Sequence, residues 1–220
     1  MRAIVLSTVL ALCSTAEASW VNYQTHEINV KVVYYGPPAS ATSRNVQYIY
    51  DRIPKEAKGP LSSLKPGSEP TLFFDYVPPG LGMIHGFQTR FHLYSAPTTL
   101  EDGKSRELVL KGADGIVFIA DSDPARQEAT LTAWKELQRY LEKQGLEPSQ
   151  VLTTVQLDHH ERPHALSVDA VKRLLGLTDQ PVVAADSATG SGLFETLKSV
   201  AKQLLHELIE GAAAKSGHAP

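Results

Sequence analysis

The sequence predicts an α/β fold: a mostly parallel, doubly wound sheet with one antiparallel edge hairpin and helices on both faces. Three observations lead to this prediction. Segments rich in β-forming residues alternate with segments whose apolar residues recur at helical spacing. The stretch "GIVFIADS" at 115–122 is continuously apolar, as in a central strand covered on both faces. "TLFFDYV" and "FQTRFHLYS" flank the Pro-Pro-Gly-Leu-Gly segment at 78–82, which predicts two antiparallel strands.

The first half of the chain is expected to begin with a βα unit. "EINVKVVYY" at 27–35 is rich in β-forming residues, and a helix is predicted over 44–53. Residues 54–70 are rich in Pro, Gly, Ser and Lys and are expected to form an exposed loop before the 71–94 hairpin. Four residues of the predicted helix share one face: Val46, Ile49, Tyr50 and Ile53.

The second half continues the alternation of helices and strands. "ELVLKGAD" is interpreted as a short helix or connector ahead of the central strand. The spacing over 125–143 predicts an amphipathic helix bounded by Gly145. "VLTTVQL" at 151–157 is the next predicted strand.

A short helix, a last strand and a long helix complete the predicted fold. Ser167 can cap the short helix "SVDAVKRLLG", which Gly176 ends. "PVVAA" is the last predicted strand, and 191–210 the last helix. The tail, residues 211–220, is small and polar and is expected to be flexible.

Ligands of such sheets bind at the carboxyl ends of the strands. The loops that should meet there are 36–43, 95–103, 122–124, 157–164 and 185–190.

Composition narrows the function classes. The 220 residues are 42% hydrophobic and 20% charged, which suits one globular domain. A net charge of -3 supplies no broad basic field, so nucleic acid is not expected as a partner. The single cysteine, Cys13, excludes an intrachain disulfide framework and a thiolate metal cluster.

Residues 1–18 have the pattern of a secretory signal. Arg2 precedes a short apolar run that ends at Leu12, and Ala16-Glu17-Ala18 is a small-residue cleavage site. The run is too short for a stable membrane span. A cleaved export signal and a start codon placed too far upstream both explain the segment.

The stretch "YYGPPASATSRNV" has the outline of a strand, a tight loop and a helix, as in a phosphate-binding loop. A G-x-x-x-x-G-K-[ST] loop would place Gly36 first. Ala41 and Thr42 stand where the second glycine and the lysine belong, whereas Ser43 keeps the final hydroxyl.

Several long segments resemble the MglA family of Ras-like small GTPases, bacterial regulators of gliding motility and cell polarity. The resemblance lies in "THEINVKVVYYGP", "NVQYIY", "TLFFDYVP", "GFQTRFHLYSAP", "LVLKGADGIVFIADS" and "ATGSGLFETLKSVAKQLL". It implies a Ras-like G domain over 19–210 and, normally, a GTP and Mg²⁺ cycle controlled by an MglB-like partner. It also implies a cytoplasmic protein, and so favours an N-terminal extension or an upstream start over export for 1–18.

Set against this family, the phosphate loop is degenerate. Pro38 removes one backbone donor, and the Cβ of Ala41 penalises a positive φ. Thr42 removes a cation whose contact with phosphate is worth about 4 kcal/mol at an effective dielectric of about 20. Ser43 still offers a hydroxyl to Mg²⁺. Arg44 is the nearby cation that could replace the lysine; otherwise it is a solvated side chain.

The two switch segments of the family have also lost side chains. Thr98 and Thr99 stand where the family has the glycine that senses the terminal phosphate and the glutamine that orients water. Thr71 resembles the metal-binding threonine, while Pro70 replaces a catalytic arginine. The resemblance therefore implies no catalytic residue for GTP hydrolysis.

The guanine-recognition motif N-K-x-D is altered too. Asp158, His159 and Glu161 replace its asparagine, lysine and aspartate, and the longer Glu161 side chain displaces the carboxylate. The last loop keeps Thr189 but has Ser187-Ala188 where a base-facing turn is expected.

Two other interpretations, an acid pair and a metal site, are not favoured. Asp121 and Asp123 could form an acid pair, but capping ahead of Pro124 explains Asp123 better. Neighbouring histidines diverge in direction and rarely bind one ion. The possible ligands, interpreted as a polar surface loop, are Asp158, His159, His160, Glu161 and His164.

The leading hypothesis is an MglA-like pseudo-GTPase that needs no cofactor and binds protein partners. The 71–94 hairpin is the candidate binding surface, and an MglB-like dimer is a candidate partner. One alternative is a divergent, active GTPase that binds GTP, GDP and Mg²⁺. Its rebuilt site would use Arg44, Ser43, Thr71 and Glu161. A second alternative is an exported binding protein.

Overall fold

The computed structural model describes residues 20–65, 69–81, 83–99 and 102–216. The signal-like segment 1–18, with Cys13, lies outside the described residues. The main sheet has the order β3-β4-β6-β2-β7-β8-β9, with β1 beside β2 and β5 beside β6. The strands are β1 Trp20–Asn22, β2 Glu27–Tyr35, β3 Ser62–Leu64, β4 Thr71–Tyr76, β5 Met83–Ile84, β6 Phe87–Ser95, β7 Gly115–Asp121, β8 Leu152–Asp158 and β9 Val182–Ala184.

Strands β6, β2, β7, β8 and β9 run parallel to one another. Strand β4 is antiparallel to β6, so the predicted hairpin pairing is confirmed. The hairpin does not form the edge, however, because β3 pairs antiparallel outside β4. The expectation of an irregular loop over 54–70 was therefore wrong in part: it contains β3 and a 3-10 helix, η1 Lys55–Ala57.

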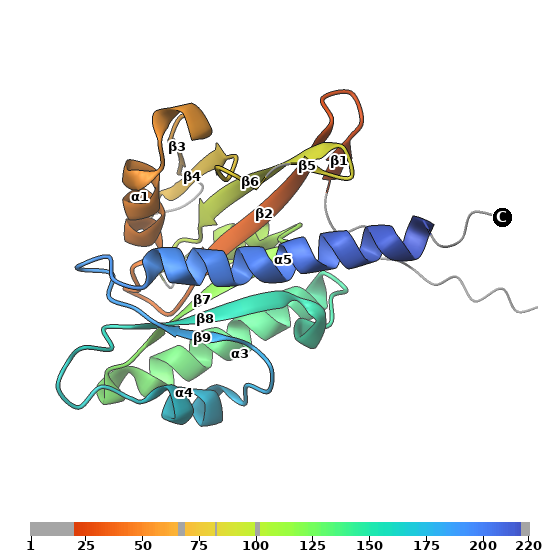
Figure 1. The fold of residues 1–220 in the computed structure, drawn as a ribbon. Coiled ribbons are helices and arrows are strands. Elements are labelled where there is room, and N and C mark those ends of the chain that lie inside the picture. The colour runs from red at the N-terminus through yellow and green to blue at the C-terminus, as the bar shows by residue number, and fades with distance from the viewer. Residues whose placement is uncertain (1–19, 66–68, 82, 100–101, 217–220) are drawn as a thin grey trace, which may run out of the picture.

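Helices cover both faces of the sheet, which confirms the predicted fold class (Figure 1). The first core lies between the sheet and α1 and α5, and the second between the sheet and α2, α3 and α4. The helices are α1 Thr42–Arg52, α2 Gly103–Leu110, α3 Gln127–Lys143, α4 Val168–Leu175 and α5 Leu193–Ser216, with 3-10 turns η3 Pro124–Arg126 and η4 Pro148–Gln150.

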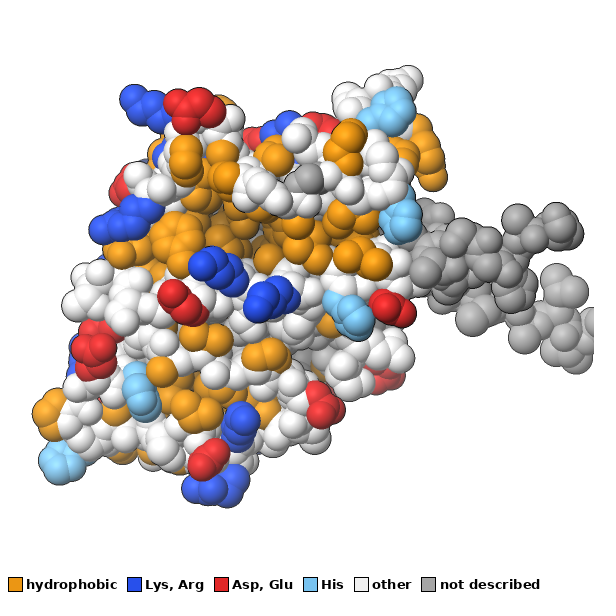
Figure 2. Space-filling view, viewed as in Figure 1, with side chains coloured by type: hydrophobic (Ala, Val, Ile, Leu, Met, Phe, Trp, Pro, Cys, Tyr) orange, Lys and Arg blue, Asp and Glu red, His pale blue; other side chains and the backbone are white. Residues whose placement is uncertain are grey.

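The central strands serve both cores because successive side chains point to opposite faces. In β7, Val117 and Ile119 belong to the first core, whereas Ile116 and Phe118 belong to the second. This confirms the prediction from the continuous apolar run. On the face that carries α5, hydrophobic side chains gather between α5 and the strands β4, β6 and β5 (Figure 2).

Helix termini agree with the sequence at α4 and differ at α5. The hydroxyl of Ser167 accepts a hydrogen bond from the amide of Ala170 at 3.2 Å, and Gly176 ends α4 with a φ of 64°. Helix α5 continues through Ser216, beyond the boundary predicted at 210. In the part of the chain that the structure describes, no helix is long and apolar enough to cross a membrane.

Candidate functional site

The five loops predicted to form a site follow parallel strands and therefore meet at one edge of the sheet. They begin after Tyr35, Ser95, Asp121, Asp158 and Ala184, the last residues of β2, β6, β7, β8 and β9. Hydrogen bonds also join the first residues of these loops to neighbouring strands. The amide of Ala96 donates to the carbonyl of Tyr34 at 2.8 Å, and that of Ser122 to the carbonyl of Asp158 at 3.1 Å.

The loop after β2 folds back so that Ser40 lies against Gly36. A Cβ atom at Gly36 would lie 2.7 Å from the hydroxyl of Ser40 and 3.0 Å from the carbonyl oxygen of Ile119. The Ser40 amide donates to the carbonyl of Pro37 at 3.0 Å. The strain expected at Ala41 is absent, because its φ is -89°; the left-handed residue is Ala39, with a φ of 60°. A non-glycine residue in that region costs about 1–2 kcal/mol.

Thr42, at the lysine position of the loop, is fully buried. Its hydroxyl donates to the carbonyl of Ala96 at 2.9 Å, so it joins the start of α1 to the loop after β6. The neighbouring Ser43 hydroxyl lies 3.1 Å from that of Ser95, which also accepts a hydrogen bond from the amide of Leu72 at 2.9 Å. Both hydroxyls near the predicted phosphate and metal positions thus tie α1 to β4 and β6.

Two other candidates lack such contacts. Thr71, the second predicted metal ligand, is fully buried, and its hydroxyl has no hydrogen-bond partner among the described residues. Arg44 is exposed, and no ion pair to it occurs within that same part of the chain. Ala41, the N-cap residue of α1, makes no side-chain hydrogen bond to the helix, so no cap from this residue competes for the amides of the first turn.

An acidic side chain that the sequence patterns did not single out, Glu69, lies in the first switch segment, next to Pro70, and contacts the second switch segment. Its carboxylate accepts hydrogen bonds from the amide of Thr98 at 2.5 Å and from the Thr98 hydroxyl at 2.9 Å. The amide of Glu69 donates to the carboxylate of Asp102 at 3.2 Å, and the Thr99 hydroxyl donates to the same carboxylate oxygen. The segment before β4 and the loop after β6 are therefore joined through two carboxylates.

A second missed side chain, Arg126, reaches the phosphate loop. Its Nη2 donates to the carbonyl of Pro38, and its Nε lies 3.5 Å from the Asp121 carboxylate. Asp123 caps η3 by accepting a hydrogen bond from the amide of Ala125 at 2.9 Å, which confirms the capping prediction. Nothing in the local sequence around Arg126 indicates a partner at Pro38.

Asp158, the first residue of the altered guanine motif, is buried and serves the fold. It accepts a hydrogen bond from the amide of Ser187 at 2.7 Å. The Ser187 hydroxyl in turn donates to the side-chain oxygen of Asn45 in α1 at 2.7 Å. Asp158 and Ser187 thus connect β8, the last loop and the first helix.

Two further candidates of the base-recognition loops face solvent. Glu161 and Thr189 are exposed, and the Thr189 hydroxyl donates only weakly, at 3.5 Å, to the carbonyl of Asp186. His159 and His164 have left-handed backbones, with φ of 58° and 63°. In the described ranges, no three His, Cys, Asp or Glu side chains are grouped to hold a metal ion.

Gly190 permits a close approach that the sequence did not reveal. Its φ is 87°, and a Cβ atom there would lie 1.8 Å from the ring of Tyr48. The guanidinium of Arg52 lies over the same ring, 3.5 Å from its centroid. The last loop is therefore packed directly on α1 beside the candidate site.

Comparison with known proteins adds one strong match. The chain is 42% identical over 193 residues to the mutual gliding-motility protein MglA of Myxococcus xanthus, and the match covers 88% of this chain and 99% of that protein. No protein-family model matches the chain.

Proposed function

The chain belongs to the MglA family of Ras-like small GTPases. Within this family, we propose that it is a pseudo-GTPase. It acts as a protein-interaction module in gliding motility or cell polarity, with weak or absent GTP binding and hydrolysis. The observation that carries this proposal is the pair of hydrogen bonds from Thr98 to Glu69.

In G domains, the residue at the position of Thr98 offers its amide to the terminal phosphate. Here that amide already donates to a carboxylate supplied by the chain itself. A bound triphosphate would have to displace Glu69 and would meet its negative charge. Displacement of a hydrogen bond to a charged group costs about 1.5–3 kcal/mol.

The phosphate loop supports the same proposal because it offers little positive charge. Thr42 supplies no cation, and its hydroxyl is bonded to the carbonyl of Ala96. Arg44 is exposed at the helix N-terminus, and Arg126 is held between Pro38 and Asp121. These residues fit a triphosphate poorly.

The base-recognition loop supports it as well. A purine needs side chains that face its ring edge, but Asp158 is turned to the amide of Ser187. Glu161 is exposed and has an extra methylene compared with the aspartate of the motif. We expect protein partners, including an MglB-like dimer, to recognise the fold rather than its nucleotide state.

Titration calorimetry with GTP and GDP in the presence of Mg²⁺ tests the proposal. We expect no submicromolar binding of either nucleotide and no phosphate release. Submicromolar affinity, or phosphate release that disappears in Ser43→Ala, would establish the opposite.

One alternative, a divergent but active GTPase, is favoured by two observations. The buried Thr71 hydroxyl lacks a partner among the described residues, and α1 begins without a side-chain cap. Both are features that a metal-bound phosphate could satisfy. The same titration separates the two functions, because only an active enzyme should bind GTP and GDP in a Mg²⁺-dependent way.

We further propose that 1–18 are an extension of a cytoplasmic domain, and that export is the alternative. N-terminal sequencing of protein purified from its natural host tests this assignment. An intact Met1, or a start downstream of it without a cleaved signal, agrees with the proposal; a mature chain that begins after Ala18 contradicts it.

A further inference from the structure

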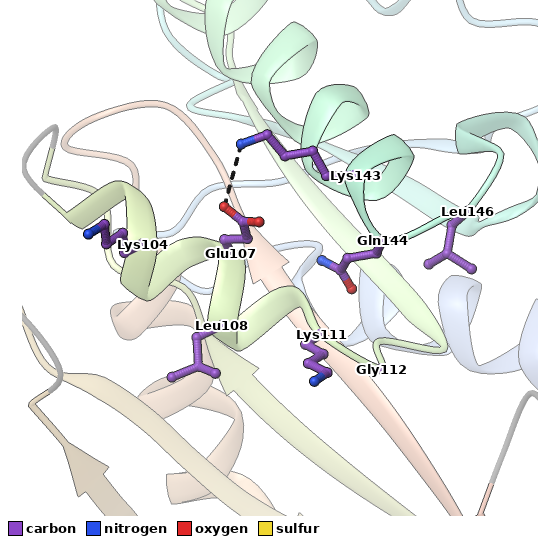
Figure 3. A pocket seen from close by; sticks show the side chains of 8 residues that line it. All are labelled: Lys104, Glu107, Leu108, Lys111, Gly112, Lys143, Gln144 and Leu146. Atoms are coloured by element: carbon purple, nitrogen blue, oxygen red, sulfur yellow. Dashed lines mark ion pairs between the residues drawn. The ribbon is translucent and has the colours of Figure 1, made fainter.

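A groove separates α2 from the end of α3. It has a volume of about 730 Å³ and is lined by side chains of α2, of the turn that follows it and of the C-terminal end of α3 (Figure 3). Pockets of roughly 300–1,000 Å³ are typical of sites for small molecules, so the groove has room for at least one large side chain of a partner.

One apolar side chain of the groove is exposed. Leu108 is 64% exposed, whereas the next two residues of α2, Val109 and Leu110, are buried in the second core. Leu146, half-buried, lies across the groove after α3 (Figure 3). A single exposed leucine is ordinary, so the charges beside it decide what the groove binds.

Those charges are mostly positive. Three exposed lysines line the groove, namely Lys104, Lys111 and Lys143, against one acidic residue, Glu107. The carboxylate of Glu107 lies 3.6 Å from Lys143 Nζ, and no ion pair to Lys104 or Lys111 occurs among the described residues. Three lysines less one glutamate give a local charge of +2 on a chain whose net charge is -3.

We propose that this groove is a docking site for a short acidic segment of a partner protein, which places a large apolar side chain against Leu108 and carboxylates beside Lys104 and Lys111. The apolar contact supplies affinity, and the charge complementarity supplies orientation and a faster association rate. This inference does not depend on whether the chain binds nucleotide.

The groove is preformed, which lowers the cost of binding. Buried Arg106 of α2 lies 3.5 Å from the carboxylate of Glu136 in α3 and donates to the carbonyl of Thr99 at 3.0 Å. These contacts hold α2 against α3 and attach it to the loop after β6. A ligand between the helices therefore needs to order little beyond the lysine side chains.

Fluorescence anisotropy with the full chain and a short labelled peptide of glutamates around one leucine tests the proposal. We expect binding that weakens about tenfold in Leu108→Ser, in line with the loss of one buried leucine contact. A charge reversal, Lys104→Glu with Lys111→Glu, should weaken binding at least as much and flatten its salt dependence. A peptide with serine in place of leucine should bind about tenfold more weakly to the unmodified chain.

Two matched variants control for exposed leucine and lysine elsewhere. Leu64→Ser removes a leucine that is 53% exposed on β3, and Lys172→Glu reverses an exposed charge on α4. Both should bind the peptide as the unmodified chain does.

Three results would overturn the proposal. One is no binding at about 1 mM peptide, a Kd that corresponds to about -4 kcal/mol. Another is equal loss of binding in the control variants. The third is self-association in sedimentation, or adsorption to vesicles of anionic lipid, that Leu108→Ser abolishes, since the groove would then bind a second copy or a membrane.

Discussion

The carboxylate of Glu69 accepts hydrogen bonds from both the backbone amide and the hydroxyl of Thr98, and this links the segment before β4 to the loop after β6. Removal of the carboxylate in Glu69→Ala should lower the free energy of unfolding by about 1–3 kcal/mol, because the nearly buried Thr98 loses its charged acceptor. Urea denaturation measures this loss, and hydrogen exchange should show faster exchange of the Thr98 amide.

Glu69→Gln keeps an acceptor without the charge and should lie between the two. Glu56→Ala, which removes an exposed carboxylate from η1, is the matched control and should change stability by less than about 0.5 kcal/mol. If Glu69→Ala behaved like the control, the carboxylate would not hold the loop.

Thr42 is expected to act as a structural residue. Thr42→Val keeps the shape but loses the hydrogen bond to Ala96, which should cost about 1 kcal/mol. Thr42→Lys should cost more, because the site is fully buried and an ammonium there has lost its water. Thermal unfolding checks both variants.

Added GDP with Mg²⁺ provides the contrasting measurement at this position. It should raise the melting temperature of Thr42→Lys more than that of the unmodified chain or of Thr42→Val, since only the lysine supplies a charge to phosphate. A large nucleotide-dependent increase in the unmodified chain would contradict the pseudo-GTPase proposal.

The ring of Tyr48 leaves no space for a side chain at position 190, so this position requires glycine. Gly190→Ala should destabilise the chain by about 1–3 kcal/mol from overpacking, with about 1–2 kcal/mol more from its positive φ. In a Tyr48→Ala background the overpacking disappears, so the same change should cost only the backbone part. A double-mutant cycle by urea denaturation measures the difference; additive losses would show that the ring is not the obstacle.

Acid should destabilise the protein in two steps. Burial, the largest cause, holds the pKa of His92 below its ordinary 6.5. The positive charges of Arg90 and Lys31 lower this pKa further, whereas the carboxylates of Asp75 and Glu27 oppose the shift. The unfolded chain therefore takes up a proton that the folded chain resists, and stability is lost as the pH falls below about 6.5.

Glu27 accounts for the second step. The hydrogen bond from Arg90 is the main reason why its pKa lies below the ordinary 4.5, and a contact of 2.7 Å joins the two side chains. This stabilisation is complete above 4.5 and is lost as the pH falls through the lower, folded-state value. Unfolding curves against pH should lose the first step in His92→Gln and the second step in Glu27→Gln.

The spacing of residues predicted most elements because local pattern and burial agree. The apolar run of β7 and the Ser167 cap of α4 are examples. Strand β3 escaped prediction because three residues are too few to show a period, and it forms only through its pairing with β4. Helix α5 passed the expected boundary since the Ala-rich residues after Gly211 have high helix propensity.

The candidate site was predicted as a set of loops and not as a set of contacts. Composition and order already imply the fold class, the meeting of five loops at one edge of the sheet and the missing lysine at Thr42, because these depend on local residue type. The contacts that fill the loops depend on residues distant in sequence: Glu69 and Thr98 are 29 positions apart, and Arg126 and Pro38 are 88 apart. No local pattern encodes such pairs, so only the tertiary structure shows that the amide of Thr98 donates its hydrogen bond to a carboxylate.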